Sequence, residues 1–267
     1  MADGFARTRF SARLRTHALG HRLLVRDTTG STNDDAWEAL GALGDGATVI
    51  ALAQARGRGR AGRAWEQAPG KGVALSVALH LGCEPGQAGL VPLAAGLAVA
   101  RAARALGVPR AALKWPNDVL VGGRKLAGVL CELKRAPGGG DAVVIGVGLN
   151  VSQSRDDFPA PLRDRATSLS LEGAPVPLED AAAETLSQLE PLWDELEEGD
   201  RAAVLAAWTA ACPHWGGRLR VRASAGEVEG VALRLAPDGG LVLRDDSGRE
   251  VTVVAGDVDA RDGRAAS

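Results

Sequence analysis

The chain contains 267 residues, of which 46% are hydrophobic and 24% are charged, so it is long enough for one large domain or for a large domain followed by a small one. Its formal net charge of −2 excludes a protein that binds nucleic acid or a membrane through an overall positive charge, and any anion site must be local. The cysteines lie far apart without a CxxC pair, which argues against a disulfide framework or a zinc site: Cys83, Cys131 and Cys212. No apolar run resembles a signal peptide or a membrane span, and we expect a cytoplasmic protein.

The first half of the chain predicts alternating strands and helices. Residues 1–20 are basic and irregular, which predicts a frayed end. Apolar periodicity then predicts a strand–turn–helix unit, a buried strand, a second strand and an Ala/Leu-rich helix, over residues 21–43, 47–53, 72–79 and 88–107. Thr32 or Asn33 is placed to cap the first of these helices.

The next segments predict a hairpin, a strand, a loop and helical structure. Residues 113–135 predict two strands joined by a Gly-Gly turn, and residues 141–151 predict a further strand. The polar segment 152–177 predicts a long loop. Residues 178–211 predict helical structure with an apolar face made of Leu186, Leu189, Trp193 and Leu196.

The pattern changes after Cys212. Short alternating runs joined by Gly-, Ser- and Asp-containing turns predict a small all-β barrel. We therefore expect a mixed α/β domain over residues 1–212 and a β domain over residues 213–267.

An unusual stretch, "RGRGRAGR", occupies residues 56–63. It matches GxGxxG formally, but no helix follows the third glycine, which argues against a dinucleotide site. Three interpretations stay open on these residues alone. The stretch is a cradle for a phosphate or carboxylate, a solvated basic loop, or a nucleic-acid contact.

Three further stretches carry polar residues suited to ligand binding, although each has a structural explanation. "KWPND" places Asn117 and Asp118 at a strand end, where an Asx turn is the alternative. Lys125 shares a strand face with Ala127 and Val129 by simple alternation, which is costly unless an anion meets it.

The other two stretches are "GSTN" at residues 30–33 and "GVGLN" at residues 146–150. Helix capping explains most of the first. The second leaves a bare strand face, on which either a flat ligand or a helix fits.

Taken in order, four segments resemble the biotin protein ligase, or biotin–[acetyl-CoA-carboxylase] ligase, family: "GSTNDDA", "QARGRGRAGRAW", "KWPNDVLVGGRKLAGVL" and "VVIGVGLNV". The resemblance covers residues 22–260, and its most specific part is the pairing of GRGRxGRxW with KWPND…KLAGxL. It implies a mixed sheet flanked by helices, of the class II synthetase type, followed by an SH3-like barrel.

The resemblance implies a two-step reaction. Biotin and MgATP form biotinyl-5′-adenylate and pyrophosphate, and the biotinyl group then passes to one lysine of a biotin carboxyl carrier protein. ATP and Mg²⁺ arrive as substrates, so we expect no metal bound by the protein alone. About twenty residues precede the first expected core strand, fewer than an N-terminal DNA-binding domain needs, so we expect the monofunctional type without operator binding. A homodimer is compatible with the sequence.

The family's functional residues transfer to this chain by position. The biotin-binding residues implied are Ser31, Thr32, Asn33, Gln54, Gly57, Arg58, Gly59, Arg60, Lys125, Gly128 and Leu130. The ATP-binding residues implied are Arg58, Arg60, Arg63, Trp65, Asn117, Lys125 and Asn150. The catalytic residues implied are Lys125, Arg60 and Asp118, with Asp118 orienting or deprotonating the incoming lysine. The loops at 52–70 and 154–175 are expected to be mobile in the empty enzyme.

Two other functions remain as alternatives. A lipoate or octanoate ligase or transferase shares the expected fold and acts on a similar carrier lysine, but lacks the paired motifs. A nucleic-acid binder would use the basic loop and would bind with a steep dependence on salt.

Overall fold

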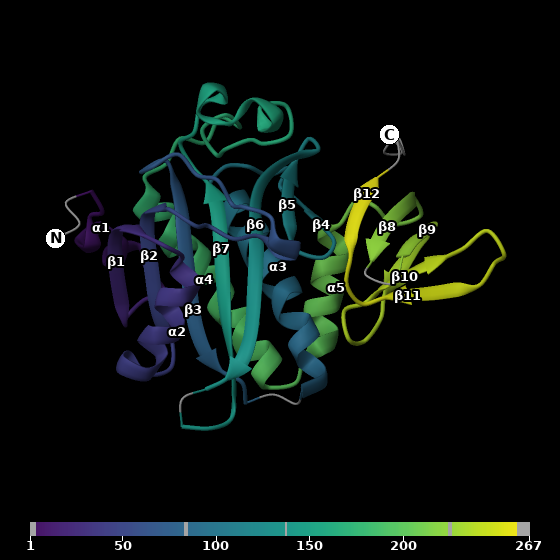
Figure 1. Ribbon diagram of the computed structural model, residues 1–267, viewed down its shortest axis with the longest axis horizontal. Helices are drawn as coiled ribbons and strands as arrows, with labels where there is room; N and C mark the ends of the chain where they lie inside the picture. The colour runs from purple at the N-terminus through teal and green to yellow at the C-terminus, as the bar shows by residue number, and fades with distance from the viewer. Residues whose placement is uncertain (1–3, 83–84, 137, 224–225, 261–267) are drawn as a thin grey trace.

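A computed structural model describes residues 4–82, 85–136, 138–223 and 226–260. Its first part is built on a seven-stranded mixed sheet in the order β1-β2-β3-β7-β6-β5-β4 (Figure 1). Only β1 and β2 pair in parallel, and the other neighbours are antiparallel. The strands are β1 (Leu23–Thr29), β2 (Ala47–Gln54), β3 (Gly72–His80), β4 (Ala112–Lys114), β5 (Asp118–Val121), β6 (Arg124–Arg135) and β7 (Asp141–Asn150).

Helices cover both faces of this sheet. Helix α2 packs on one face, over β2 and β3. On the opposite face the central helix α3 packs against α4 and α5, and α1 packs against α4. The helices are α1 (Arg7–Arg13), α2 (Thr32–Leu43), α3 (Val91–Ala105), α4 (Leu178–Glu197) and α5 (Arg201–Ala211), with short 3₁₀ turns η1 (Arg60–Gly62), η2 (Pro85–Leu90), η3 (Arg155–Asp157) and η4 (Ala160–Leu162).

The α2 face of the sheet has two halves. Along β7, Ala142 and Val144 pack in the small apolar cluster under α2. The next residues of the same parity are Gly146, Gly148 and Asn150, and all three line a cavity instead. Loss of side-chain volume along one strand therefore converts a packed surface into the wall of a cavity.

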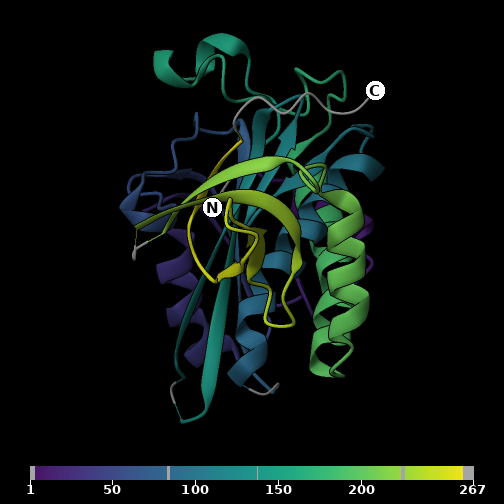
Figure 2. The same cartoon turned by 90° about the vertical axis from the view of Figure 1, so that its right-hand side faces the viewer.

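A second, five-stranded antiparallel sheet follows in the order β11-β10-β9-β8-β12 (Figure 1), and this sheet faces the viewer in Figure 2. Its strands are β8 (Arg218–Ala223), β9 (Gly226–Leu235), β10 (Leu241–Arg244), β11 (Glu250–Val253) and β12 (Asp257–Ala260). Its apolar residues join the main core cluster, and the Trp115 indole donates a 3.0 Å hydrogen bond from Nε1 to the carbonyl of Gly239. The expectation of a mixed α/β fold followed by a β-sheet region is confirmed, while the boundary near residue 212 and the SH3-like label stay predictions.

One sequence expectation was wrong. Residues 7–13 form α1 rather than a frayed end, because Phe5 and Phe10 are buried and Glu179 accepts a hydrogen bond from the Ala6 backbone. The expectation of helical structure over residues 178–211 is confirmed. This segment forms two helices, because Gly199 adopts a positive φ of 86° and Asp200 caps α5.

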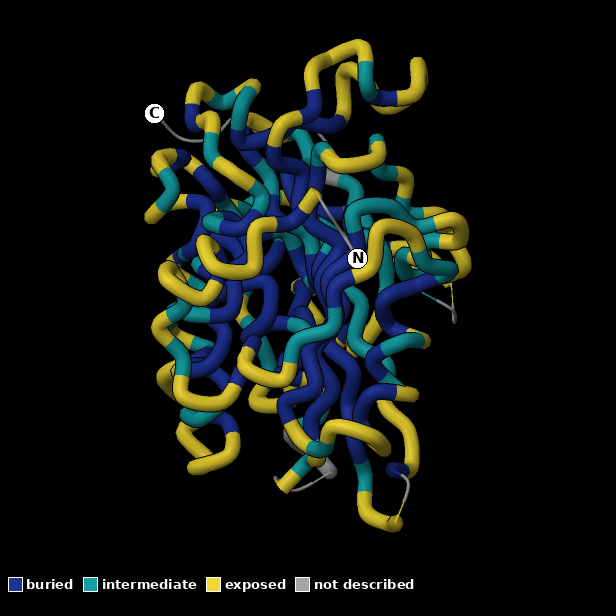
Figure 3. The backbone as a smooth tube through the Cα atoms, turned by 90° about the vertical axis from the view of Figure 1, so that its left-hand side faces the viewer, coloured by how far each residue is buried: buried dark blue, intermediate teal, exposed yellow. Residues whose placement is uncertain are grey.

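One helical stretch, Ala88–Ala105, is long and apolar enough by composition to cross a membrane, but 67% of it is buried inside the protein. It packs at the centre of the core, where an apolar surface on all sides is expected. Figure 3 shows burial concentrated along the strands, with exposed connecting loops.

Candidate active site

A cavity of about 500 Å³ opens on the α2 face of the sheet. This volume is within the usual range for small-molecule sites. Its walls come from the start of α2, the end of β2, the arginine–glycine loop (defined here as residues 56–65), β5 to β7, the segment after η3, and β12. The second sheet therefore contributes to the cavity, through Arg222, Asp257, Val258 and Asp259.

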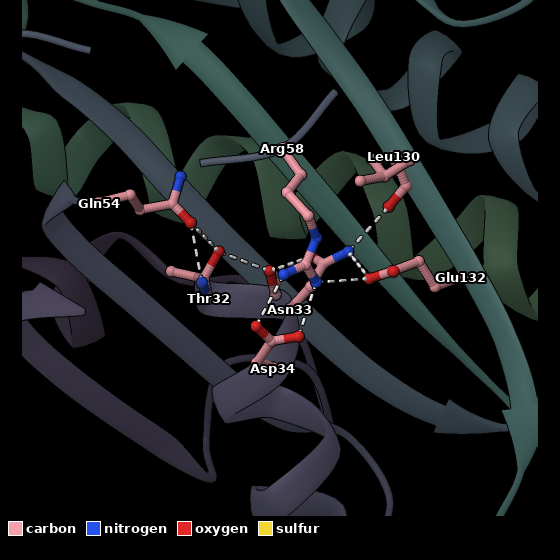
Figure 4. Close-up of polar contacts among 8 residues, drawn as sticks. Thr32, Asn33, Asp34, Gln54, Arg58, Leu130 and Glu132 are labelled. Atoms are coloured by element: carbon pink, nitrogen blue, oxygen red, sulfur yellow. Dashed lines mark hydrogen bonds and ion pairs between the residues drawn. The ribbon is translucent and has the colours of Figure 1, made fainter. Parts of the chain in front are cut away.

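Neutral polar side chains form one end of the cavity (Figure 4). Gln54 Oε1 accepts hydrogen bonds from the Thr32 backbone N–H at 2.8 Å and from the Thr32 hydroxyl at 3.1 Å. The Ser76 hydroxyl lies 2.8 Å from Thr32 Oγ1. Ser31 is the N-cap of α2, but its side chain makes no capping hydrogen bond and lines the cavity. Helix capping by Thr32 or Asn33 was therefore a wrong interpretation of this stretch.

Asn33 belongs to the same end but is held by protein groups. Its Nδ2 donates to Glu132 Oε2 at 2.6 Å and to the Leu130 carbonyl at 3.4 Å, and its Oδ1 lies 2.7 Å from the Ser76 hydroxyl. A Cβ on Gly146 would collide with the Asn33 side chain. Both amide protons of Asn33 are thus engaged, which leaves the side chain as a rigid wall of the cavity.

The arginine–glycine loop folds back on itself over the glycine-lined strands. The Trp65 backbone donates to the Gly57 carbonyl at 2.9 Å, and the Gly59 backbone donates to the Arg63 carbonyl at 2.7 Å. The Trp65 indole lies on β7, where a Cβ at Gly148 would collide with it. The bare strand face is therefore covered by an aromatic side chain rather than by a helix.

The three arginines that follow Gly57 have different partners. Arg58 forms a two-pronged ion pair with Asp34, at 2.7 and 2.6 Å, and this pairing lowers the pKa of Asp34. Arg63 pairs with Asp257 at 2.7 Å. Arg60 Nη1 bonds two neutral oxygens, Asn117 Oδ1 and the Gly256 carbonyl, both at 3.3 Å. Burial lowers the pKa of Arg60.

Lys125 points into the same cavity. Its ammonium lies 2.6 Å from Asp118 Oδ1 and 5.6 Å from the centre of a Trp65 ring. The expectation that Lys125 shares a face with Ala127 and Val129 was wrong. The β5–β6 register shifts between Val119 and Leu120, and this bulge turns Lys125 to the cavity side.

The far end of the cavity is bounded by the segment after β7. The Lys125 backbone donates to the Arg165 carbonyl at 2.7 Å and accepts from the Thr167 N–H at 2.9 Å. Asn150 Nδ2 donates to the Thr167 carbonyl at 2.9 Å. Phe158 and Leu162 add apolar surface to this wall. This exposed segment stands above the strand ends in Figure 1.

The comparisons with known proteins agree with this geometry. The chain matches the Biotin/lipoate A/B protein ligase family over residues 25–150. It is 41% identical over 238 residues to the "Biotin--[acetyl-CoA-carboxylase] ligase" of Mycobacterium tuberculosis, covering 86% of this chain and 85% of that protein. It is 31% identical to the "Bifunctional ligase/repressor BirA" of Bacillus spizizenii, covering 88% of this chain and 73% of that protein. The chain belongs to the biotin/lipoate A/B protein ligase family.

Among solved structures, the chain is similar to the biotin protein ligase from Aquifex aeolicus in complex with biotin and ATP. The two have a TM-score of 0.78 and are 25% identical, and the match covers 90% of this chain and 99% of that one. Because the part of this chain left unmatched is shorter than the segment that forms the second sheet, the match includes at least part of that sheet.

Fifteen of the sixteen site residues that the ligase motifs imply line the cavity, and the exception is Gly57. Gly57 lies beneath the Trp65 carbonyl, where a Cβ would collide. Ligand contacts by these residues stay predictions. Sequence reasoning missed Ser76, Glu132 and Asp257. The sequence offered one indication for Glu132. It is a charged residue two positions after Leu130, so strand alternation predicts that it lies on the same, cavity-facing side of β6.

The described residues contain no group of three or more His, Cys, Asp or Glu side chains arranged to hold a metal ion. Cys131 and Cys212 are free thiols. Burial raises the pKa of both, to about 11 for Cys212, so neither is a reactive thiolate at neutral pH. Cys83 lies outside the described residues.

Proposed function

We propose that this protein is a biotin protein ligase, which activates biotin with ATP and transfers it to a specific lysine of a biotin carboxyl carrier protein. One observation carries the proposal. The arginine–glycine loop and Lys125 meet in one cavity whose other end is neutral and rich in hydrogen-bonding groups. The relatives' names favour biotin over lipoate or octanoate as the acid.

The two ends of the cavity suit the two ends of an acyl adenylate. We assign the neutral end, with Ser31, Thr32 and Gln54, to the ureido group of biotin, which needs both donors and acceptors. Trp65 and the glycine-lined strands fit the flat ring and its apolar tail. Asn117 and Asn150 lie on the nucleotide side, and Phe158 offers a surface for adenine.

In the first step, a biotin carboxylate oxygen attacks the α-phosphorus of ATP, and pyrophosphate leaves. Negative charge accumulates on the phosphate oxygens in the transition state. Lys125 and Arg60 both line the cavity, and we assign them to stabilise this charge without a covalent bond. Arg60 now bonds only neutral oxygens, so phosphate oxygens would replace weaker acceptors.

In the second step, the carrier lysine amine attacks the acyl carbon, an amide forms, and AMP leaves. The attacking amine must be neutral, and it loses a further proton as the amide forms. We assign Asp118 to orient this amine and accept a proton, because its carboxylate lies 2.6 Å from Lys125 within the cavity.

Magnesium would arrive with ATP as a substrate. Such ions are usually held by phosphates with one or two carboxylates, and Asp118 and Asp257 both line the cavity. Its contribution would be to neutralise phosphate charge. We also propose a cytoplasmic protein that does not bind nucleic acid and is able to form a homodimer, with loops 52–70 and 154–175 more mobile in the empty enzyme than with ligand bound.

The test is ATP–pyrophosphate exchange in the presence of biotin, with lipoate and octanoate as matched alternative acids. We expect exchange with biotin alone. Exchange with lipoate or octanoate but not biotin would favour a lipoate-type ligase instead. Salt-dependent DNA binding without any acid-dependent exchange would favour the nucleic-acid interpretation.

A further inference from the structure

Arg58 lies between two carboxylates from distant parts of the chain (Figure 4). Its guanidinium forms the two-pronged pair with Asp34, from the first turn of α2, and lies 3.4 Å from Glu132 Oε2, on β6. We call Asp34 and Glu132 the acidic pair. A planar guanidinium that meets a carboxylate through two parallel hydrogen bonds is fixed in direction as well as position.

The acidic pair also reaches the wall of the cavity. Glu132 Oε2 accepts a 2.6 Å hydrogen bond from Asn33 Nδ2, and Asn33 packs against Gly146. One carboxylate therefore joins the arginine–glycine loop to the residue that bounds the neutral end. The loop, the start of α2 and β6 are connected at a single point.

Fixing Arg58 also fixes Trp65. Arg58 faces Ala64 across the folded loop, and the Trp65 N–H bonds the Gly57 carbonyl. The indole then lies over Gly148 and Gly128. A movement of Arg58 away from the acidic pair would carry this cover away from the cavity.

The arginines of the loop therefore divide into different roles. In the described part of the chain, Arg58 is engaged by carboxylates, whereas Arg60 bonds only neutral oxygens. Of these two arginines, Arg60 is therefore able to bind a phosphate without first breaking an ion pair. The side chains of Arg58, Asp34 and Glu132 are 38%, 49% and 26% exposed, and ion pairs at such exposure are weak enough to open for substrate entry.

We propose that Asp34 and Glu132 are positioning residues that hold the arginine–glycine loop closed through Arg58 and thereby set how long the bound acid and its adenylate stay in the cavity. The statement about ligand retention rests on the proposed function. The statement about the loop does not, because the ion pairs join residues of the chain itself. The two parts therefore have separate tests.

The loop is tested with trypsin on the ligand-free protein, since trypsin cleaves after arginine and the loop contains several. Asp34→Asn with Glu132→Gln should accelerate cleavage within residues 56–63 by about 5- to 30-fold, as expected for the loss of two partly exposed ion pairs. Asp246→Asn is the matched control, because it breaks a similar two-pronged pair with Arg218 outside the cavity. Cleavage of the double variant at the wild-type rate overturns the proposal, whatever the enzyme's activity.

Retention is tested by forming biotinyl-5′-adenylate on the enzyme from labelled biotin. Release of the label is then followed after dilution into an excess of unlabelled biotin. The double variant should release it about 5- to 30-fold faster, while the exchange rate at saturating biotin and ATP changes less. If Arg58 instead serves the phosphates, removing its protein partners would slow release or lower the KM for ATP, and that result overturns the proposal. Adding Arg58→Ala to the double variant should change release little further.

Thermal unfolding separates positioning from a general loss of structure. The single variants Asp34→Asn and Glu132→Gln serve if the double variant is unstable, and each should show part of the effect. If no variant affects retention except in proportion to its loss of thermal stability, the role is merely structural and the proposal fails. If trypsin cleaves the double variant faster than the wild-type protein, but the wild-type protein forms no adenylate, the loop contact stands and the proposed function is rejected.

Discussion

The two ends of the cavity are built from different interactions. At the neutral end, Thr32, Asn33 and Ser76 are buried, and their hydrogen bonds are satisfied within the protein. At the charged end, Lys125 and Arg63 are partly exposed and form ion pairs with carboxylates. Under the proposed function, the neutral end would be prepared before the ligand arrives, whereas the cations of the charged end would exchange these carboxylates for phosphate oxygens.

The largest effect should come from removing charge. Lys125→Ala should lower kcat/KM for biotin-dependent pyrophosphate exchange by about 10²- to 10³-fold, because it removes a cation aimed at the developing phosphate charge. Lys134→Ala is the matched control, since Lys134 lies 5.0 Å from the Trp37 ring and does not line the cavity. A Lys125→Ala enzyme within threefold of the control would contradict the role assigned to this lysine.

A smaller effect is expected from filling the glycine-lined surface. Gly148→Ala should raise the KM for biotin by about tenfold to a hundredfold, because the new methyl group collides with Trp65 and displaces it. Gly96→Ala in α3 adds the same methyl with only an ordinary 3.6 Å contact to Leu113, so it should leave this KM unchanged. Equal steady-state kinetics for the two variants would mean that ligand does not bind over β7.

Breaking the neutral end should have a still smaller effect. Gln54→Ala removes the acceptor for the Thr32 N–H and hydroxyl, and should raise the KM for biotin about five- to tenfold with little change in the KM for ATP. Gln188→Ala on α4, which loses only a hydrogen bond to Glu184, is the control. A larger effect on ATP than on biotin would reverse our assignment of the two ends.

The smallest effect is expected from His214, which lies between α5 and β8, where the first part of the chain joins the second sheet. That sheet supplies Asp257 to the charged end of the cavity. Burial, with Lys114 nearby, lowers the pKa of His214 from its ordinary 6.5. Protonation therefore favours the unfolded chain, so this contribution to stability is complete above about pH 6.5 and is lost as the pH falls through the depressed pKa. His214→Gln should lessen the fall in melting temperature between pH 7.5 and pH 5. Parallel plots of melting temperature against pH for His214→Gln and the wild-type protein would contradict this role of His214.

Much of the fold and cavity could be predicted from local sequence because the motifs are short and lie at strand ends. Helix α1 could not, since seven residues carry a weak periodic signal and the helix depends on distant partners such as Glu179. The orientation of Lys125 depends on a bulge that pairing with β5 creates, so strand alternation alone assigned it to the wrong face. The partners of Arg58 were also hidden, because Glu132 is 74 positions away.

The central claim is that a loop arginine and Lys125 act on the same acyl phosphate. The most direct measurement is a crystal structure of this protein with biotinyl-5′-adenylate bound. We predict that Lys125 Nζ and an Arg60 nitrogen both lie within about 3.5 Å of oxygens of that acyl-phosphate group, with Arg58 still on Asp34. An adenylate bound with Arg60 still on Asn117 and Gly256, or with Lys125 turned away from the phosphate, would contradict it.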